Sequence, residues 1–191
     1  MNDTSLRRFL VEDLEIESDF CVIKGREARH MSRVLRMRKR DAVILLDGKG
    51  GRFLAEIQSV SGDAVSVRIK ETMDPVTVPA IEIILCQAVI KSSPMDYLIQ
   101  KTSELGVTRI LPFFSSRSVV HLGVERCKKK RHRWKEIAYS AAKQCNRDIP
   151  AEIGFPVSFE EQLNLAGDAS GPKVILWEKE NAQDLKTLLK N

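Results

Sequence analysis

Between Ile81 and Phe114 the chain reads IEIILCQAVIKSSPMDYLIQKTSELGVTRILPFF. Its near-continuous apolar start predicts a buried strand over Ile81–Gln87. A helix is expected over Pro94–Leu105, with the proline near its first turn and Gly106 as the residue that ends it. A second strand follows at Arg109–Phe114. Strand, helix and strand in this order predict an α/β fold, in which helices cover both faces of a parallel sheet.

The same alternation continues toward the C-terminus. A long basic helix is expected next, with Trp134, Ile137, Ala138, Ala141 and Cys145 on its buried side. Ser158 and Glu161 then have the spacing of a capping box, which predicts a short helix. A strand over Lys173–Trp177 and a last helix from about Ala182 complete the pattern. The chain then stops without a helix stop signal, so we expect a further C-terminal segment.

The first third of the chain is β-rich instead. Asp47–Gly51 and Ser61–Asp63 are rich in glycine and aspartate and predict tight hairpin loops. One helix is expected over Glu27–Met37. The short apolar or β-branched runs that predict strands are Phe9–Val11, Phe20–Lys24, Ala42–Asp47, Arg52–Val60 and Ala64–Lys70.

These patterns divide the chain into two domains. The stretch ETMDPVTVP at 71–79 has two prolines and no helical period, so it marks a change of pattern. We expect a small β-barrel over 1–72, a linker over 73–79 and an α/β domain over 80–191. A length of 191 residues, 43% of them hydrophobic, suffices for both cores and excludes a disordered or fibrous chain.

Positive charge is concentrated in two segments. The net charge is only +5, yet Lys24–Arg40 and Arg126–Lys135 carry a net +7 each, so the rest of the chain is acidic. Clustered Lys and Arg release counterions from a phosphate backbone, whereas scattered charges do not. The two segments therefore favour a nucleic-acid partner, with a solvated helix face as the alternative.

Other features restrict the class of protein. The cysteines, Cys21, Cys86, Cys127 and Cys145, are far apart and form no CxxC pair, which indicates reduced thiols and neither a disulfide framework nor a zinc site. The N-terminus has no signal-peptide pattern, and no apolar run is long enough to cross a bilayer. We therefore expect a cytoplasmic protein without a membrane segment.

Candidate functional residues follow the predicted parallel strands, because such a sheet presents its site at the carboxyl ends of its strands. Gln87 and Lys91 follow the first strand, and Arg117 follows the second among small hydroxyl residues. Gln144, Asn146 and Arg147 close the basic helix. Each has a structural alternative, such as pairing of Arg117 with an acid. No GxGxxG follows a strand, which argues against the common dinucleotide loop.

Several long motifs, in one order, resemble a known family. RRFLV at Arg7–Val11, HMSRVLRMRKRD at His30–Asp41 and LLDGKGGRFLAEI at Leu45–Ile57 come first. QAVIKSSPMDYLIQKTSELGV, LPFFSSRSVV and RWKEIAYSAAKQCNRDIP follow between Gln87 and Pro150. Together they resemble the ribosomal RNA small-subunit methyltransferase E (RsmE) family over nearly the whole chain.

The resemblance implies a PUA-like RNA-binding barrel followed by a SPOUT domain, in which a trefoil knot holds S-adenosylmethionine. It also implies a homodimer that methylates N3 of one uridine in 16S rRNA, within the small ribosomal subunit. This reaction requires no metal, because the methyl donor is already activated. The family's donor-binding motif would come after Asn191, so the knot is expected to be incomplete in this chain. Two alternatives stay open: an inactive RNA-binding module, and a SPOUT enzyme that acts on another RNA position.

The implied reaction assigns roles to residues. Uridine N3 must lose a proton before it attacks the methyl group, and cations near the uracil oxygens stabilise the resulting anion. The candidates are Arg117 first, then Lys91 and Arg147. The residues expected to hold the RNA backbone are Arg7, Arg8, His30, Arg33, Arg36, Arg38, Lys128, Lys129, Lys130 and Arg131.

Overall fold

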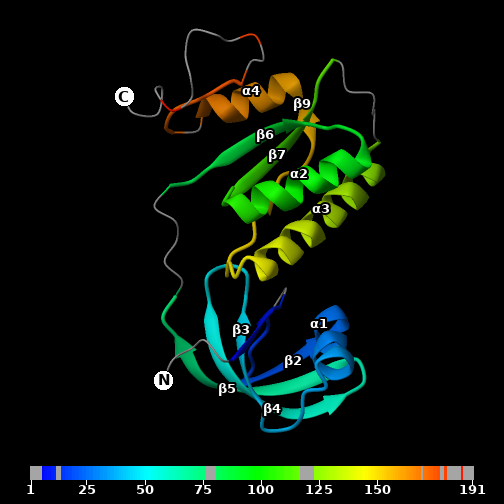
Figure 1. Cartoon of the computed structure of the whole chain (residues 1–191), viewed down its shortest axis with the longest axis vertical. Coiled ribbons are helices and arrows are strands. Elements are labelled where there is room, and N and C mark those ends of the chain that lie inside the picture. Colours follow the sequence, from blue (N-terminus) through cyan, green and yellow to red (C-terminus); the bar gives the residue numbers. More distant parts are fainter. Residues whose placement is uncertain are drawn as a thin grey trace.

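The computed structural model describes residues 6–11, 14–75, 81–116, 123–168 and 170–176, together with residues 179 and 186. These residues form two domains, each built on its own sheet (Figure 1). The first sheet holds the strands up to residue 73, and the second begins at residue 84. The α/β fold with a parallel sheet, preceded by a β-rich domain, is confirmed.

The N-terminal domain is a five-stranded sheet in the order β1-β3-β4-β5-β2. Strand β1 runs parallel to β3, and every other pair is antiparallel. In the loop between β3 and β4, Asp47 Oδ1 accepts hydrogen bonds from the backbone amides of Lys49 and Gly51, which fixes the predicted hairpin. The strand bounds are Arg7–Leu10 (β1), Phe20–Lys24 (β2), Ala42–Leu46 (β3), Arg52–Ser61 (β4) and Ala64–Met73 (β5).

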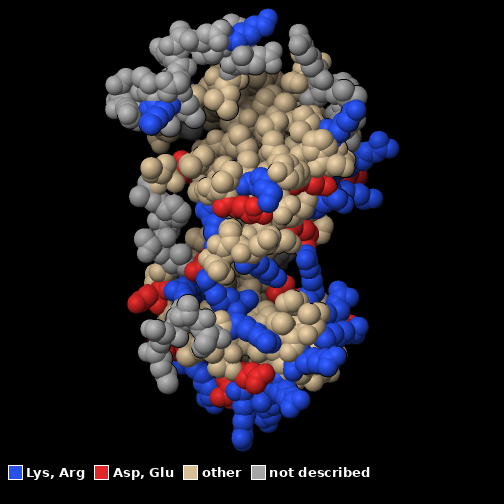
Figure 2. Space-filling model, viewed as in Figure 1, with Lys and Arg blue, Asp and Glu red and all other residues tan. Residues whose placement is uncertain are grey.

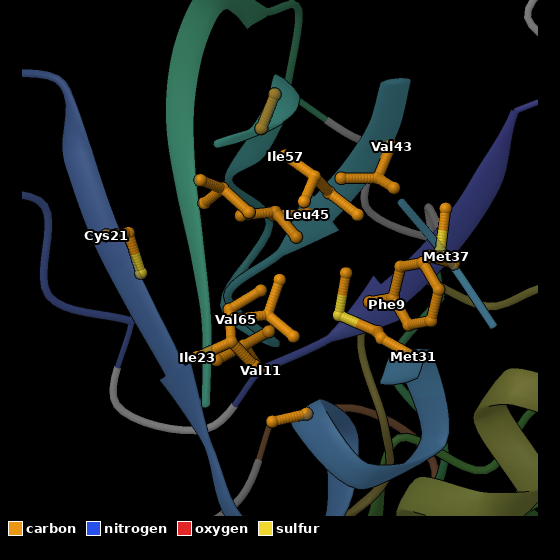
Figure 3. Close-up of a cluster of buried hydrophobic side chains, with 13 residues drawn as sticks. Phe9, Val11, Cys21, Ile23, Met31, Met37, Val43, Leu45, Ile57 and Val65 are labelled. Atoms are coloured by element: carbon orange, nitrogen blue, oxygen red, sulfur yellow. The ribbon is translucent and has the colours of Figure 1, made fainter. Parts of the chain in front are cut away.

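The core of this domain follows from strand alternation. On β2, Cys21 and Ile23 are buried while the residues on either side are exposed. Figure 3 shows these two side chains directed toward apolar residues from the neighbouring strands and from the helical segment. The cluster includes Phe9, Met31, Met37, Val43, Leu45, Ile57 and Val65. Burial of this cluster is what holds the curved sheet together.

The helix predicted over Glu27–Met37 is shorter and different in type. An α-helix, α1, spans Gly25–Arg29, and a π-helical turn, η2, spans His30–Val34. The segment ends there because Arg36 takes a left-handed conformation, with a φ angle of 50°. Met37 is thereby turned into the core, where it is buried. The prediction therefore placed both helix ends incorrectly. Of its expected apolar side, Ala28, Met31 and Leu35 pack inward, whereas Val34 is 67% exposed.

The C-terminal domain is a parallel sheet. Strand β7 pairs with β6 on one side, and with the two short strands β8 and β9 on the other, all in parallel. The helix that joins β6 to β7 ends at Gly106, whose φ angle of 109° is the left-handed conformation expected there. The bounds are Ile84–Ala88 (β6), Ser92–Leu105 (α2), Arg109–Phe114 (β7), Val124–Gln144 (α3), Glu152–Ile153 (β8), Val157–Ser158 (β9) and Phe159–Asp168 (α4).

Helices lie on both faces of this sheet (Figure 1). On one face, Met95 and Ile99 of α2 and Trp134 and Ala138 of α3 pack against Ile110 of β7. On the other face lies α4, whose buried Gln162 donates a hydrogen bond from Nε2 to the Cys86 Sγ atom. The layered arrangement predicted from the strand and helix alternation is therefore present.

The end of the described chain differs from the prediction. Residues Lys173–Leu176 form no strand, and Ile175 and Leu176 are more than four-fifths exposed. An apolar run becomes a strand only when a neighbour supplies its hydrogen bonds, and none of the described strands pairs with this run. Trp177 lies outside the described residues, and so does the helix expected from about Ala182 apart from Lys186, which is helical.

Ion pairs join the two domains. The Asp148 carboxylate, 9% exposed, pairs with Arg8 on β1 and lies 3.7 Å from Arg52 Nε on β4. Lys143, near the end of α3, pairs with Glu27 of α1. Charged groups this poorly solvated gain more from pairing than exposed ones. The end of α3 is therefore fixed against the barrel.

Candidate functional site

The carboxyl ends of β6, β7 and β9 meet at one edge of the sheet, because these strands run parallel. Val89, just after β6, continues the pairing by donating its backbone N–H to the Phe113 carbonyl oxygen, at 2.8 Å. Ser115 follows β7 at the same edge. We call this region the carboxyl edge. It is where a parallel sheet places its site.

Helix α2 starts at the carboxyl edge. Lys91 precedes its first residue, and no side chain caps this end of the helix. The Lys91 carbonyl oxygen accepts the Met95 N–H at 3.1 Å, while the Lys91 side chain is exposed. The free amides and the helix dipole make this end positive, as does the ammonium group. Sequence reasoning placed Lys91 correctly at the rim of the sheet.

A second lysine reaches the same place from α3. Lys130 Nζ donates a hydrogen bond to Ser92 Oγ at 3.0 Å, and it lies 5.8 Å from the ring centroid of the buried Trp134. This contact brings a residue predicted to bind RNA next to one predicted to act in catalysis. Sequence reasoning did not select Ser92, although its position directly after Lys91 was a usable signal.

Gln87 is half-buried and lies one residue before the end of β6. Its side-chain amide donates to the Ala88 carbonyl oxygen at 2.9 Å. This contact is local, within β6 itself, so Gln87 does not cap the neighbouring strand as its structural alternative predicted. The geometry therefore gives Gln87 no chemical role.

The other basic residues of α3 divide into structural and exposed groups. Arg131 is half-buried and donates from Nε to the Ile153 carbonyl oxygen at 2.9 Å, so it supports β8. Arg133 donates twice to Asp96 on α2, which raises the pKa of the guanidinium group. Lys128 pairs with the neighbouring Glu125, and Lys129 is exposed. Only part of this charged segment is thus presented to a partner.

Arg147 does not join Lys91. Its Nη1 atom donates to the Ser103 carbonyl oxygen at 3.2 Å, near the end of α2. Ser92 and Ser103 are separated by eleven residues of this helix, about 16 Å along its axis. Arg147 and Lys91 therefore lie at opposite ends of α2 within one chain. Arg117, the first catalytic candidate, lies outside the described residues, three positions after the end of β7.

The barrel presents a second basic surface around α1 and η2. Arg36, Arg38 and His30 are exposed, with the His30 ring 6.3 Å from that of Phe9. Arg33 pairs with Asp63 at 3.0 Å, with both side chains about two-thirds exposed, so this pair is weak. Arg7 is exposed and donates to the Leu35 carbonyl oxygen. These five residues form what we call the barrel basic surface.

Arg8 stands apart from this surface, because it is held by Asp148 at the domain junction. Asp148 itself was missed by sequence reasoning, which looked for cations and not for the carboxylates that hold them. Figure 2 shows Lys and Arg side chains of both domains along the right-hand edge of the view, where α1 and the start of α3 lie in Figure 1. One extended polyanion is thus able to contact both domains.

No described helix combines the length and the apolar character needed to cross a membrane. Among the same residues, no three His, Cys, Asp or Glu side chains gather as metal ligands would. The expectation that the reaction needs no metal stays a prediction.

Known proteins match both domains. A family model described as an RNA methyltransferase domain matches residues 77–191, and one described as an RNA methyltransferase PUA domain matches residues 23–70. Ribosomal RNA small subunit methyltransferase E of Bacillus subtilis is 34% identical over 76% of this chain. The protein of the same name from Buchnera aphidicola (subsp. Acyrthosiphon pisum) is 29% identical over 80% of it.

A solved structure agrees with these matches. Ribosomal RNA small subunit methyltransferase E of Neisseria gonorrhoeae, bound to S-adenosyl methionine, has 30% identity and a TM-score of 0.73 over 83% of this chain. The chain covers 65% of that structure, and 57% and 60% of the two curated relatives. The RNA methyltransferase model alone matches more than half of the chain. The chain therefore belongs to the RNA methyltransferase family that includes ribosomal RNA small subunit methyltransferase E.

Proposed function

We propose that this protein transfers a methyl group from S-adenosylmethionine to N3 of one uridine in the 16S rRNA of the small ribosomal subunit. The observation that carries the proposal is the contact between Lys130 and Ser92 beside Lys91. It concentrates positive charge at the carboxyl edge of a parallel sheet, in a chain of an RNA methyltransferase family. The names of its relatives support the ribosomal substrate.

The proposed reaction requires the carboxyl edge to stabilise the anion of the uracil base. Uridine N3 carries a proton between two carbonyl groups, so it becomes a nucleophile only when that proton leaves. The negative charge then spreads onto the two uracil oxygens. Lys91, Lys130 and the amides at the start of α2 are donors of the kind that stabilises such charge. We assign Arg117 the same role, because it follows β7 by three positions in the sequence.

The methyl donor is a second ligand, distinct from the uracil anion. Since the amides of α2, Lys91 and Lys130 are assigned to the anion, no described residue is assigned to the donor. When bound, S-adenosylmethionine supplies a methyl group that is already activated on a sulfonium. The protein's own residues then have two tasks, which are to stabilise the deprotonated base and to align it.

The RNA must present the uridine unpaired, because N3 lies on the base-pairing edge. The barrel basic surface and the exposed lysines of α3 are suited to hold the backbone on either side of it, without reading sequence. We further propose that the enzyme works as a homodimer in the cytoplasm, as the family resemblance implies. Arg147 lies at the opposite end of α2 from Lys91, so it does not contact the uracil that is methylated at the carboxyl edge of its own chain.

The experiment is nucleoside analysis by mass spectrometry. The protein is expressed from its own gene and incubated with S-adenosylmethionine and an RNA substrate. The substrate is either free 16S rRNA or small ribosomal subunits, the latter purified from a strain that lacks the gene. N3-methyluridine should appear at one site. Lys91→Gln should lower kcat about a hundredfold. Lys70→Gln removes the same charge from the outer side of β5 and should leave kcat unchanged.

Other results would select the alternatives. A methylated nucleoside other than N3-methyluridine would indicate a SPOUT enzyme with another RNA position as its target. Tight RNA binding without any transfer of labelled methyl groups would indicate an inactive RNA-binding module. Equal activity of Lys91→Gln and wild type would remove the carboxyl edge from the reaction.

A further inference from the structure

A cavity of about 420 Å³ lies where the barrel meets the end of α3. Its walls come from both domains: β1, β3 and the residue before β1 on one side, and the last turn of α3 with the two residues after Cys145 on the other. We call it the junction cavity. Its volume falls within the range of about 300–1,000 Å³ that is usual for small-molecule pockets. Its lining residues are Leu6, Arg8, Leu10, Leu46, Lys143, Asn146 and Arg147.

The two sides of the cavity differ in chemistry. The barrel side is a leucine floor, in which Leu10 and Leu46 belong to a buried cluster and Leu6 packs against them. The opposite side carries Lys143 and Arg147. An apolar surface that faces cations suits a ligand with a flat apolar part and an anionic part. A nucleotide, with its base and its phosphate, has this composition.

The charge around the cavity is positive overall. Three cations, Arg8, Lys143 and Arg147, line it, and the carboxylates Asp148 and Glu27 pair with Arg8 and Lys143, respectively. The ion pairs take up part of the positive charge, and the excess favours an anion at this junction. Figure 2 shows Lys and Arg side chains gathered at the level where the two domains meet.

The cationic side is held in place by the end of α3. Arg147 donates its backbone N–H to the Ala142 carbonyl oxygen at 2.8 Å, and Asn146 donates to the Lys143 carbonyl oxygen. Asn146 has a φ angle of 56°, so these contacts form a Schellman motif with asparagine in the left-handed position. The Arg147 guanidinium is anchored in turn by the Ser103 carbonyl oxygen. Little ordering is therefore left to be done when a ligand binds.

We infer that the junction cavity binds one nucleotide of the RNA substrate, with the base on the leucine floor and a phosphate against Lys143 and Arg147. This inference rests on the proposed function. The cavity lies beside the end of α2 that is opposite Lys91, so this nucleotide is not one that is methylated at the carboxyl edge of the same chain. Through this nucleotide, the barrel and the C-terminal domain both contact the same RNA strand.

The test measures binding of fluorescein-labelled hexauridylate by anisotropy, in the whole protein. Leu6→Trp fills the cavity without changing any charge, and it should weaken binding about tenfold. Arg147→Gln should do the same and Arg147→Lys should restore most of the loss, since a phosphate contact needs the charge. Lys70→Gln is the control, because Lys70 does not line the cavity and pairs with Glu56 on β4. Thermal unfolding confirms that each variant is folded.

Photo-crosslinking provides a second readout. Hexauridylate with one 4-thiouridine should crosslink to peptides that contain Leu6, Leu10 or Leu46, and Leu6→Trp should abolish these crosslinks. Wild-type affinity in folded Leu6→Trp, or crosslinks confined to the barrel basic surface, would overturn the inference. Methyl transfer to rRNA is measured on the same samples. Normal transfer combined with either of those results would reject the cavity and leave the proposed function intact.

Discussion

Asp148→Asn tests how the two domains are held together. The side chain is 9% exposed and faces Arg8 and Arg52, which are 29% and 21% exposed. Asparagine keeps the shape but removes the charge that offsets two partly buried guanidinium groups. Breaking a fully buried pair costs about 3–5 kcal/mol. Because water still reaches both arginines, we expect a smaller loss of about 2 kcal/mol in the free energy of unfolding.

The assay is urea unfolding followed by circular dichroism and by tryptophan fluorescence, which reports on the C-terminal part of the chain because Trp134 and Trp177 both belong to it. Asp63→Asn is the matched control, because its pair with Arg33 is about 65% exposed on both sides and should cost under about 0.5 kcal/mol. If the junction couples the domains, Asp148→Asn should also separate the two signals into different transitions. A change as small as that of Asp63→Asn, with coincident transitions, would refute the argument.

Three further predictions concern the site and the surface. Arg117→Ala should lower turnover far more than RNA affinity, as measured by kinetics and anisotropy, and equal losses would indicate a phosphate contact instead. Charge reversal of Arg33 and Arg36 should weaken RNA binding and flatten its dependence on salt in titrations from low to high salt; an unchanged slope would place both residues outside the interface. The hydrogen bond from Lys101 lowers the pKa of the Glu104 carboxyl, whose ordinary value is 4.5. The hydrogen bond therefore stabilises the folded protein above pH 4.5, and this stabilisation is lost as the pH falls through the lowered pKa of Glu104. Glu104→Gln should thus reduce the fall in melting temperature below pH 4.5. An unchanged dependence of the melting temperature on acid pH would contradict this assignment.

Much of the fold follows from local pattern. The strands Phe20–Lys24 and Arg109–Phe114 have the predicted bounds, because alternating or continuous apolar residues agree with what their neighbours require. Gly106 ends its helix as expected, since a left-handed residue there strongly favours glycine. In these places local propensity and tertiary packing point to the same structure.

Other features depend on what lies across the molecule. The apolar run at Lys173 has the pattern of a strand but lacks a pairing neighbour among the described residues. The short strands β8 and β9 were not predicted, because their hydrogen bonds to β7 define them. Position along the chain also misleads about distance. Arg147 follows a helix end and resembles a rim residue, yet α2 separates it from Lys91.

The candidate site shows the same division. Lys91 was predictable, because the carboxyl end of a parallel strand is a general location for chemistry. The contact between Lys130 and Ser92 was not, since it depends on how α3 crosses α2. Asp148 was invisible for a similar reason, because its partners lie on β1 and β4, far away in sequence.

The length of α2 sets the distance between the two proposed contacts with RNA. One end carries the lysines, and the other meets the junction cavity about 16 Å away. A mononucleotide is too short to touch both ends at once, whereas a strand of several nucleotides spans them. The protein would thus select its substrate by reach as well as by charge, so that lengthening α2 by one turn should shift which nucleotide, counted from the anchored one, arrives at the lysines.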